Sequence, residues 1–104
     1  MKLKKEFLIK GNVWALKYKW GLKADGVMVD GLTDQTTRTI YIDQSLKGED
    51  KLIVFLHEFI HASLLEIHLS GPSDILTSDV EEIIATGLSE IISSTFDLKW
   101  KRKE

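Results

Sequence analysis

Large side chains alternate with small or charged ones in the first part of the chain. From Trp14 to Trp20, the even-numbered positions hold Trp, Leu, Tyr and Trp, while the odd-numbered positions between them hold Ala and two Lys. A period of two places alternate side chains on one face of a sheet. Segment 7–9 alternates in the same way, and the dipeptide Gly11-Asn12 between the two segments predicts a tight turn. We therefore expect a hairpin here, with both Trp side chains packed in the core or on a sheet face.

A second pair of segments also favours strands. Residues 27–29 (Val-Met-Val) and 39–42 (Thr-Ile-Tyr-Ile) are rich in residues that prefer strands. The polar segment 34–37 between them is typical of a connecting turn. Together with the first hairpin, these segments predict a small antiparallel sheet of three to four strands.

The second half of the chain has a helical pattern. Nearly all faces are apolar from about Asp50 to Leu69, which predicts a central, buried helix that ends before Gly71-Pro72. From about Ser78 to Phe96, apolar residues recur at steps of three and four, which predicts a second helix with one buried stripe. The expected stripe consists of Val80, Ile83, Ile84, Leu88, Ile91 and Ile92.

A run of strands followed by a run of helices predicts an α+β fold, with the small sheet packed on two helices. The chain has 104 residues, of which 43% are hydrophobic, and a net charge of −2. This length is typical of one domain, so we expect residues 1–104 to form a single domain that is too apolar to be disordered. The absence of Cys excludes a disulfide scaffold, a cysteine zinc site and a cysteine nucleophile. A transition metal would have to be bound by carboxylates and the three His.

The charges are unevenly distributed along the chain. Residues 1–23 hold seven Lys and one Glu, residues 24–97 three Lys or Arg and fourteen Asp or Glu, and residues 98–104 four Lys or Arg and one Glu. No aromatic pattern accompanies the basic ends, so we expect solvated surfaces and no nucleic-acid partner. There is no signal-peptide pattern, and no apolar run has the length and the lack of charges of a membrane span. These observations predict a cytoplasmic protein without a membrane partner.

The segment His57-Glu58-Phe59-Ile60-His61 is an HExxH motif within the most apolar stretch of the chain. On a helix, the four-residue step places both imidazoles on one face, where they can share one ion. Two His nitrogens are typical ligands of Zn²⁺. Glu58 lies beside this pair and is the candidate catalytic base, which accepts a proton from a water activated by the metal. Burial of such groups without partners is costly, so a metal site is the economical explanation.

The third ligand must come from outside the motif. His68 lies seven residues after His61, about 10 Å further along a continuous helix, and cannot reach the same ion unless the helix breaks. Glu81 on the second helix borders the expected stripe and is our preferred ligand, although it can also close a capping box that begins at Ser78. Glu82, which is expected nearer the solvent-exposed side of that helix, is the alternative third ligand. The predicted zinc ligands are therefore His57, His61 and Glu81.

A buried HExxH helix, an acidic residue on the next helix and a small antiparallel sheet before both resemble the gluzincin metallopeptidases of minimal size, the minigluzincins. The resemblance to the ImmA/IrrE-type peptidases is more distant. Segment 38–43 is similar to the strand that borders the substrate cleft in that clan, and segment 81–85 to its glutamate helix. The resemblance implies a minimal zincin fold, bound zinc, and hydrolysis of peptide bonds in a substrate that lies antiparallel to the cleft strand. It leaves the residue that stabilises the oxyanion unassigned, with Tyr41 and His68 as candidates.

We therefore expect a zinc metallopeptidase that acts on a peptide or protein substrate, as a monomer or a small homo-oligomer. The short chain leaves little material for substrate selection, and its activity is expected to be narrow or latent. The basic segment 99–103 is a candidate for a tail that lies in the cleft. The alternative is a zincin-fold module that keeps zinc for stability or for binding a partner. A structural zinc site is closed by four protein ligands, whereas a catalytic site keeps one position open.

Overall fold

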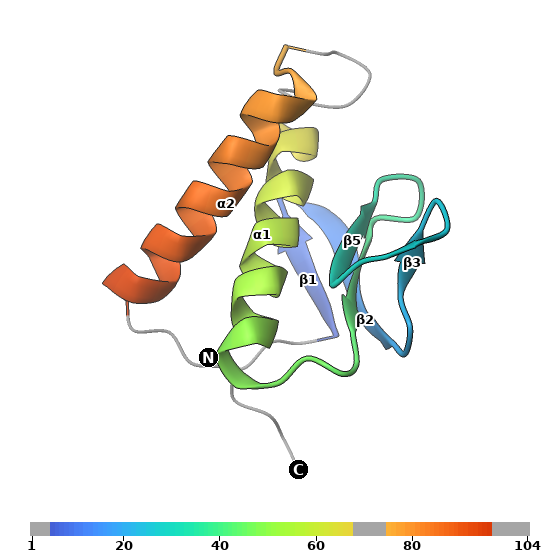
Figure 1. Cartoon of the computed structure of the whole chain (residues 1–104). Coiled ribbons are helices and arrows are strands. Elements are labelled where there is room, and N and C mark those ends of the chain that lie inside the picture. Colours follow the sequence, from blue (N-terminus) through green and yellow to red (C-terminus); the bar gives the residue numbers. More distant parts are fainter. Residues whose placement is uncertain (1–4, 68–74, 97–104) are drawn as a thin grey trace.

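The computed structural model describes residues 5–67 and 75–96. Helix α1 (Gly48–Glu66) lies between a β-sheet on one side and helix α2 (Ser78–Thr95) on the other (Figure 1). The predicted α+β fold, a small sheet with two helices, is confirmed. As its all-round apolar pattern predicts, α1 is the central element of the molecule.

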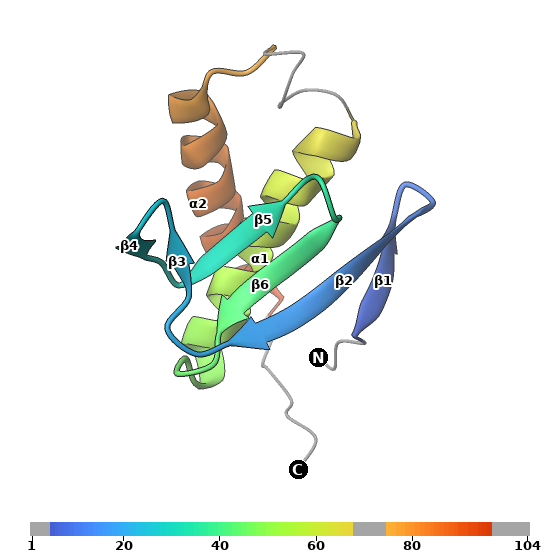
Figure 2. The same cartoon turned by 90° about the vertical axis from the view of Figure 1, so that its right-hand side faces the viewer.

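The main sheet has four strands in the order β1-β2-β6-β5 (Figure 2). Its strands are β1 (Glu6–Ile9), β2 (Asn12–Lys19), β5 (Gly31–Asp34) and β6 (Thr39–Asp43). Strands β1 and β2 are antiparallel, as are β5 and β6, whereas β2 and β6 run parallel. The sheet is thus mixed, whereas the sequence predicted an entirely antiparallel sheet. A separate two-stranded hairpin is formed by β3 (Lys23–Ala24) and β4 (Val27–Met28).

Two details of strand pairing differ from the sequence-based prediction. The first turn lies at Lys10-Gly11, one residue before the predicted position, because Ile9 pairs with Asn12 and both turn residues have positive φ angles. The antiparallel partner of β6 is β5 and not segment 27–29, of which Val27 and Met28 pair within the small hairpin. Strand β5 contains only four residues, of sequence Gly-Leu-Thr-Asp, and these have no clear strand pattern.

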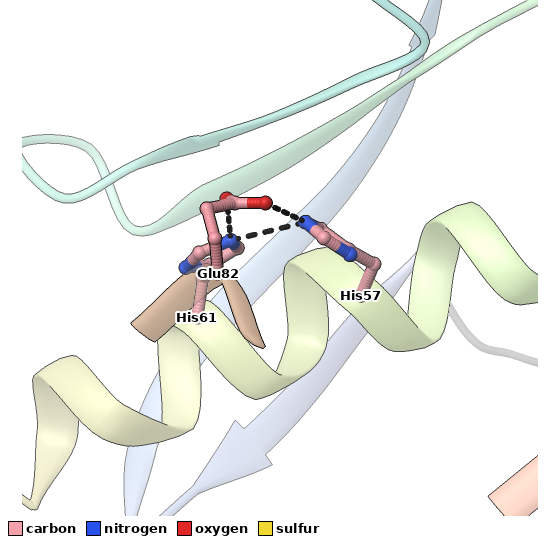
Figure 3. A group of neighbouring side chains, drawn as sticks. All are labelled: His57, His61 and Glu82. Carbon is pink, nitrogen blue, oxygen red and sulfur yellow. Dashed lines mark hydrogen bonds and ion pairs between the residues drawn. The ribbon is translucent and has the colours of Figure 1, made fainter. Parts of the chain in front are cut away.

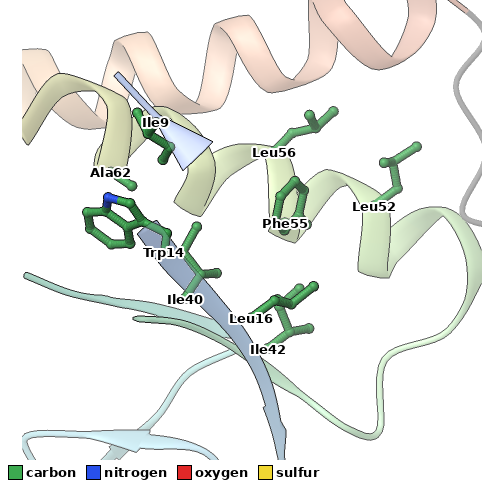
Figure 4. Close-up of a cluster of buried hydrophobic side chains, with 9 residues drawn as sticks. All are labelled: Ile9, Trp14, Leu16, Ile40, Ile42, Leu52, Phe55, Leu56 and Ala62. Carbon is green, nitrogen blue, oxygen red and sulfur yellow. The ribbon is translucent and has the colours of Figure 1, made fainter. Parts of the chain in front are cut away.

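The hydrophobic core lies between the main sheet and α1 (Figure 4). Its buried residues are Ile9, Trp14, Leu16, Ile40, Ile42, Leu52, Phe55, Leu56 and Ala62. Trp14 is 1% exposed, which confirms its predicted place in the core. Trp20 is 75% exposed, so the prediction for this residue was wrong. It follows the last residue of β2, Lys19, and therefore lies beyond the part of the strand that pairs with β6.

The apolar stripe predicted for α2 is confirmed only in part. Ile84 and Ile92 are partly buried and pack on the core, whereas Val80, Ile83, Leu88 and Ile91 are exposed. The fully buried residues of this helix are Ala85 and Ser89, whereas Ile83 is 71% and Ile91 57% exposed. Helix α2 packs mainly on α1, and small side chains on the contact face let the two helices approach closely. Because the sheet covers only the opposite side of α1, the exposed apolar residues of α2 have no second layer to pack against within the described part of the chain.

A buried carboxylate at the end of α1 ties the sheet to this helix. Glu66 accepts hydrogen bonds from Nε1 of Trp14 at 2.7 Å and from Nε of Arg38 at 3.0 Å. The hydrogen bond from Trp14, followed by the hydrogen bond and charge of Arg38, holds the pKa of Glu66 below its ordinary value despite burial. A carboxylate with a lowered pKa stabilises the fold at neutral pH, and this contribution is lost as the pH falls through its folded-state pKa.

We expect Glu66→Gln to reduce the free energy of unfolding at pH 7 by about 1 kcal/mol, because the amide can still accept from Trp14 but carries no charge for Arg38. The difference from the wild type should shrink as the pH falls below about 4.3, the ordinary pKa of a glutamate. Urea unfolding of both proteins at pH 7 and at pH 3 measures this. Glu90→Gln, at an exposed position of α2, is the control. If the wild type and Glu66→Gln differ in their free energy of unfolding by the same amount at both pH values, the stabilising role of the Glu66 charge is contradicted.

Candidate metal centre

The two His of the motif lie one turn apart on α1, and their rings face each other. Nε2 of His57 and Nε2 of His61 are 3.1 Å apart. The carboxylate of Glu82 extends from α2 to both rings, with Oε1 2.8 Å from Nε2 of His61 and Oε2 3.3 Å from Nε2 of His57 (Figure 3). Donor atoms of these three residues lie within 4.8 Å of one another, so they can converge on one ion.

The structure brings Glu82, and not the preferred Glu81, to the ring edges that face each other. The carboxylate of Glu81 contacts the other ring nitrogen of His61, Nδ1. A carboxylate at Nδ1 favours the tautomer in which this nitrogen carries the proton and donates it, which leaves the lone pair of Nε2 free for a metal. Glu81 is therefore placed to orient His61. This arrangement is common around metal-binding histidines.

The packing of α2 explains which glutamate reaches the histidine pair. Buried Ser89 lies seven residues after Glu82, two helical turns away on nearly the same face.

The N-terminal cap of the helix is Thr77, whose side chain accepts a hydrogen bond from the main-chain N–H of Val80. The alternative role of Glu81 in a capping box that begins at Ser78 is therefore not found.

Glu58 lies beside the histidine pair and is held from the sheet side. Oγ1 of Thr33, on β5, lies 2.8 Å from Oε1 of Glu58 and 3.1 Å from its main-chain oxygen, and it donates to them. Burial raises the pKa of the Glu58 carboxyl, while the hydrogen bond from Thr33 and the nearby imidazoles of His61 and His57 act in the opposite direction. A buried carboxylate with a raised pKa has the properties of a general base.

A glycine lets β5 approach α1 at this point. A Cβ atom on Gly31 would lie 2.7 Å from Cγ1 of Val54 and 2.8 Å from Cγ of Glu58, closer than such atoms approach in proteins. A larger residue at this position would therefore have to displace the strand or the carboxylate. Gly31 and Thr33 together set the distance between β5 and Glu58.

A pocket of about 360 Å³ lies beside the histidine pair and Glu58. It is lined by Asp30, Gly31, Ile53, Val54, His57, Glu58 and Glu82. It thus extends from the sheet edge across α1 to the glutamate of α2. The strand that borders it is β5, at the edge of the sheet, whereas segment 38–43, which forms β6, lies inside the sheet between β2 and β5.

The residues of the HExxH motif are recognisable in the sequence, whereas those contributed by β5 are not. Thr33 and Glu58 are 25 residues apart, so no local spacing relates them. The sequence around Gly31 has neither a recognisable motif nor a strand pattern. Two other predictions, His68 as a possible ligand and the tail 99–103 as a cleft segment, lie outside the described residues.

Comparisons of the chain with models of protein families, with curated proteins and with solved structures found no match. Because none of these comparisons indicates a family, the expected resemblance of HExxH and the following acidic helix to the gluzincins depends on these residues alone.

The described helices α1 and α2 do not have the length and apolar character needed to cross a membrane.

Proposed function

We propose that this protein is a zinc-dependent peptidase in which His57, His61 and Glu82 hold the metal and Glu58 is the catalytic base. The observation that carries the proposal is the convergence of two Nε2 atoms and one carboxylate from two helices, with a separate buried carboxylate beside them. Two His nitrogens and one Glu oxygen are a donor set typical of catalytic zinc. Glu81 supports the same interpretation, since it fixes the tautomer that leaves Nε2 of His61 unprotonated.

The number of donors favours a catalytic site over a purely structural one. Within residues 5–67 and 75–96, three protein side chains form the group, whereas structural zinc sites are closed by four. The fourth position would then serve water and substrate. Zinc bound here would lower the pKa of a water molecule towards about 7 and polarise the carbonyl group of a substrate.

The role of Glu58 follows from its position. Thr33 contacts Oε1, so the carboxylate is held in one orientation while Oε2 stays free of that bond. Glu58 accepts the proton of the attacking water and then transfers it to the leaving amine nitrogen. The carbon–nitrogen bond of the peptide breaks as a carboxylic acid and an amine form. The proton thus passes from water to the amine through one side chain.

Strand β5 is an edge strand of the main sheet, and its outer edge has no paired strand among residues 5–67 and 75–96, which suits an extended peptide. The main-chain N–H of Asp43 donates to the oxygen of Asp30, so residues 30, 32 and 34 carry the hydrogen bonds to β6. The main-chain groups of Gly31 and Thr33 therefore face away from β6, at the edge next to the pocket. A peptide that adds to this edge as a further strand would lie along the histidine pair. We infer that the substrate binds in this way.

Metal removal tests the proposed function. Protein purified with zinc should hydrolyse blocked peptides, lose this activity after dialysis against a chelator, and regain it with one equivalent of Zn²⁺. Peptide cleavage is measured by chromatography and zinc content by atomic absorption. A protein that binds one zinc ion and cleaves no peptide in a broad set would contradict the peptidase assignment and favour a zinc-binding module. Cleavage that persists without metal would contradict the role of zinc.

A further inference from the structure

Three carboxylates line the pocket beside Glu58. Asp30, Glu58 and Glu82 contribute to its wall, and the lining contains no Lys or Arg from residues 5–67 and 75–96. In the proposed function, Glu82 would hold zinc, which would neutralise its charge, and Glu58 accepts the proton of water. Asp30 is the acidic lining residue to which that function gives no role.

The fold does not use the side chain of Asp30 either. This residue is exposed, and its main-chain oxygen, not its carboxylate, accepts the hydrogen bond from Asp43. Among residues 5–67 and 75–96, its carboxylate forms no hydrogen bond or ion pair. A carboxylate that lines a pocket without a partner can receive a cation from a ligand.

Apart from the three carboxylates and His57, the wall of the pocket is apolar. Ile53 and Val54 of α1 line it, and Gly31 contributes no side chain. An engineered cavity of about 150 Å³ holds a benzene molecule, so a pocket of about 360 Å³ has room for a long, unbranched side chain. An aliphatic stem would contact the two apolar residues while a charged end reaches the acidic rim.

We propose that this pocket is the specificity site of the enzyme and that it binds an arginine or lysine side chain of the substrate, with Asp30 as the residue that meets the cation. The inference rests on the proposed function, since it assumes a peptide along the free edge of β5. Gly31 is the first residue whose main-chain groups face that edge, and it also lines the pocket. A peptide paired there would have a side chain beside the pocket entrance.

Binding is measured in the zinc-loaded Glu58→Gln protein, because the peptides are not hydrolysed during the measurement. In this protein Asp30 is the acidic lining residue whose charge is not neutralised by zinc or removed by substitution. The ligands are blocked alanine pentapeptides with arginine, norleucine or glutamate at the centre, and calorimetry gives their Kd. We expect the arginine peptide to bind about fivefold more tightly than the norleucine peptide, the size of an exposed ion pair, and the glutamate peptide to bind most weakly. Asp30→Asn should remove the difference between arginine and norleucine, and Asp30→Lys should favour glutamate.

Asp79→Asn is the matched control, because it removes one exposed acidic charge of α2 that does not line the pocket. It should leave the order of the peptides unchanged. Equal affinity for all three peptides, or an arginine preference that survives Asp30→Asn, overturns the proposal. Hydrolysis by the wild type without such a preference would remove the pocket assignment and keep the peptidase. If the arginine peptide is bound preferentially but the wild type hydrolyses no peptide, the pocket assignment is kept and the peptidase assignment is removed.

Discussion

Glu58→Gln is expected to bind zinc with unchanged stoichiometry and to hydrolyse peptides about 10²- to 10⁴-fold more slowly than the wild type. The amide has the shape of the carboxylate and can still accept a hydrogen bond from Thr33, so the contact between α1 and β5 should persist. It cannot take a proton from water, however, and the attack on the carbonyl group would lack its base. Zinc binding is measured by competition with a chromophoric chelator, and hydrolysis by chromatography of the products.

The matched control for this experiment is Glu90→Gln, the same substitution at an exposed position of α2. It should change neither zinc binding nor the rate of hydrolysis. Full hydrolysis by a clean preparation of the Glu58→Gln protein would show that another group is the base. Loss of zinc binding in that protein would instead indicate that Glu58 is a metal ligand, contrary to the arrangement of the three donors on His57, His61 and Glu82.

Glu82→Ala is expected to lower the affinity for zinc by more than about 100-fold, and Glu81→Ala by about 10- to 100-fold. The reason for the difference is that Glu82 offers its oxygens to the two facing Nε2 atoms, whereas Glu81 contacts Nδ1 of His61. Loss of a ligand removes a bond to the metal. Loss of the orienting carboxylate removes only the preference of the ring for one tautomer. Competition titrations with zinc measure both affinities.

These two variants control for each other, because both replace a glutamate in the first turns of α2 with the best helix former. Their helical content and thermal unfolding should be similar. An affinity lower in Glu81→Ala than in Glu82→Ala would restore Glu81 as the ligand. Equal, small losses in both would indicate that neither side chain coordinates the metal.

The sequence predicted those parts of the site that depend on local geometry. The HExxH spacing places His57 and His61 on one face of any regular helix, and the structure has their Nε2 atoms 3.1 Å apart. The long apolar run around them predicted a central helix, and α1 does lie between the sheet and α2. The class of the fold followed in the same way from the order of strand and helix patterns.

The choice between Glu81 and Glu82 could not be made from the sequence because it depends on how α2 is rotated against α1. The large apolar residues of α2 predicted a packed face that favoured Glu81. In the structure the small residues Ala85 and Ser89 are the fully buried ones, with Ile84 and Ile92 partly buried beside them, and the helix presents Glu82 to both histidines. Hydrophobicity alone is a poor guide to a face on which close approach, rather than apolar area, decides the packing.

By itself, then, the sequence predicted which helix carries the histidine pair, which ion its residue types suit and which side chain is the candidate base. These features arise from residues within one helical turn, whose relative positions are set by the geometry of the helix. Only the tertiary structure decided that Glu82 completes the donor group, that Thr33 holds Glu58, and that β5 rather than β6 borders the pocket. These contacts join segments more than twenty residues apart, and they exist only once the sheet and both helices have packed around the core.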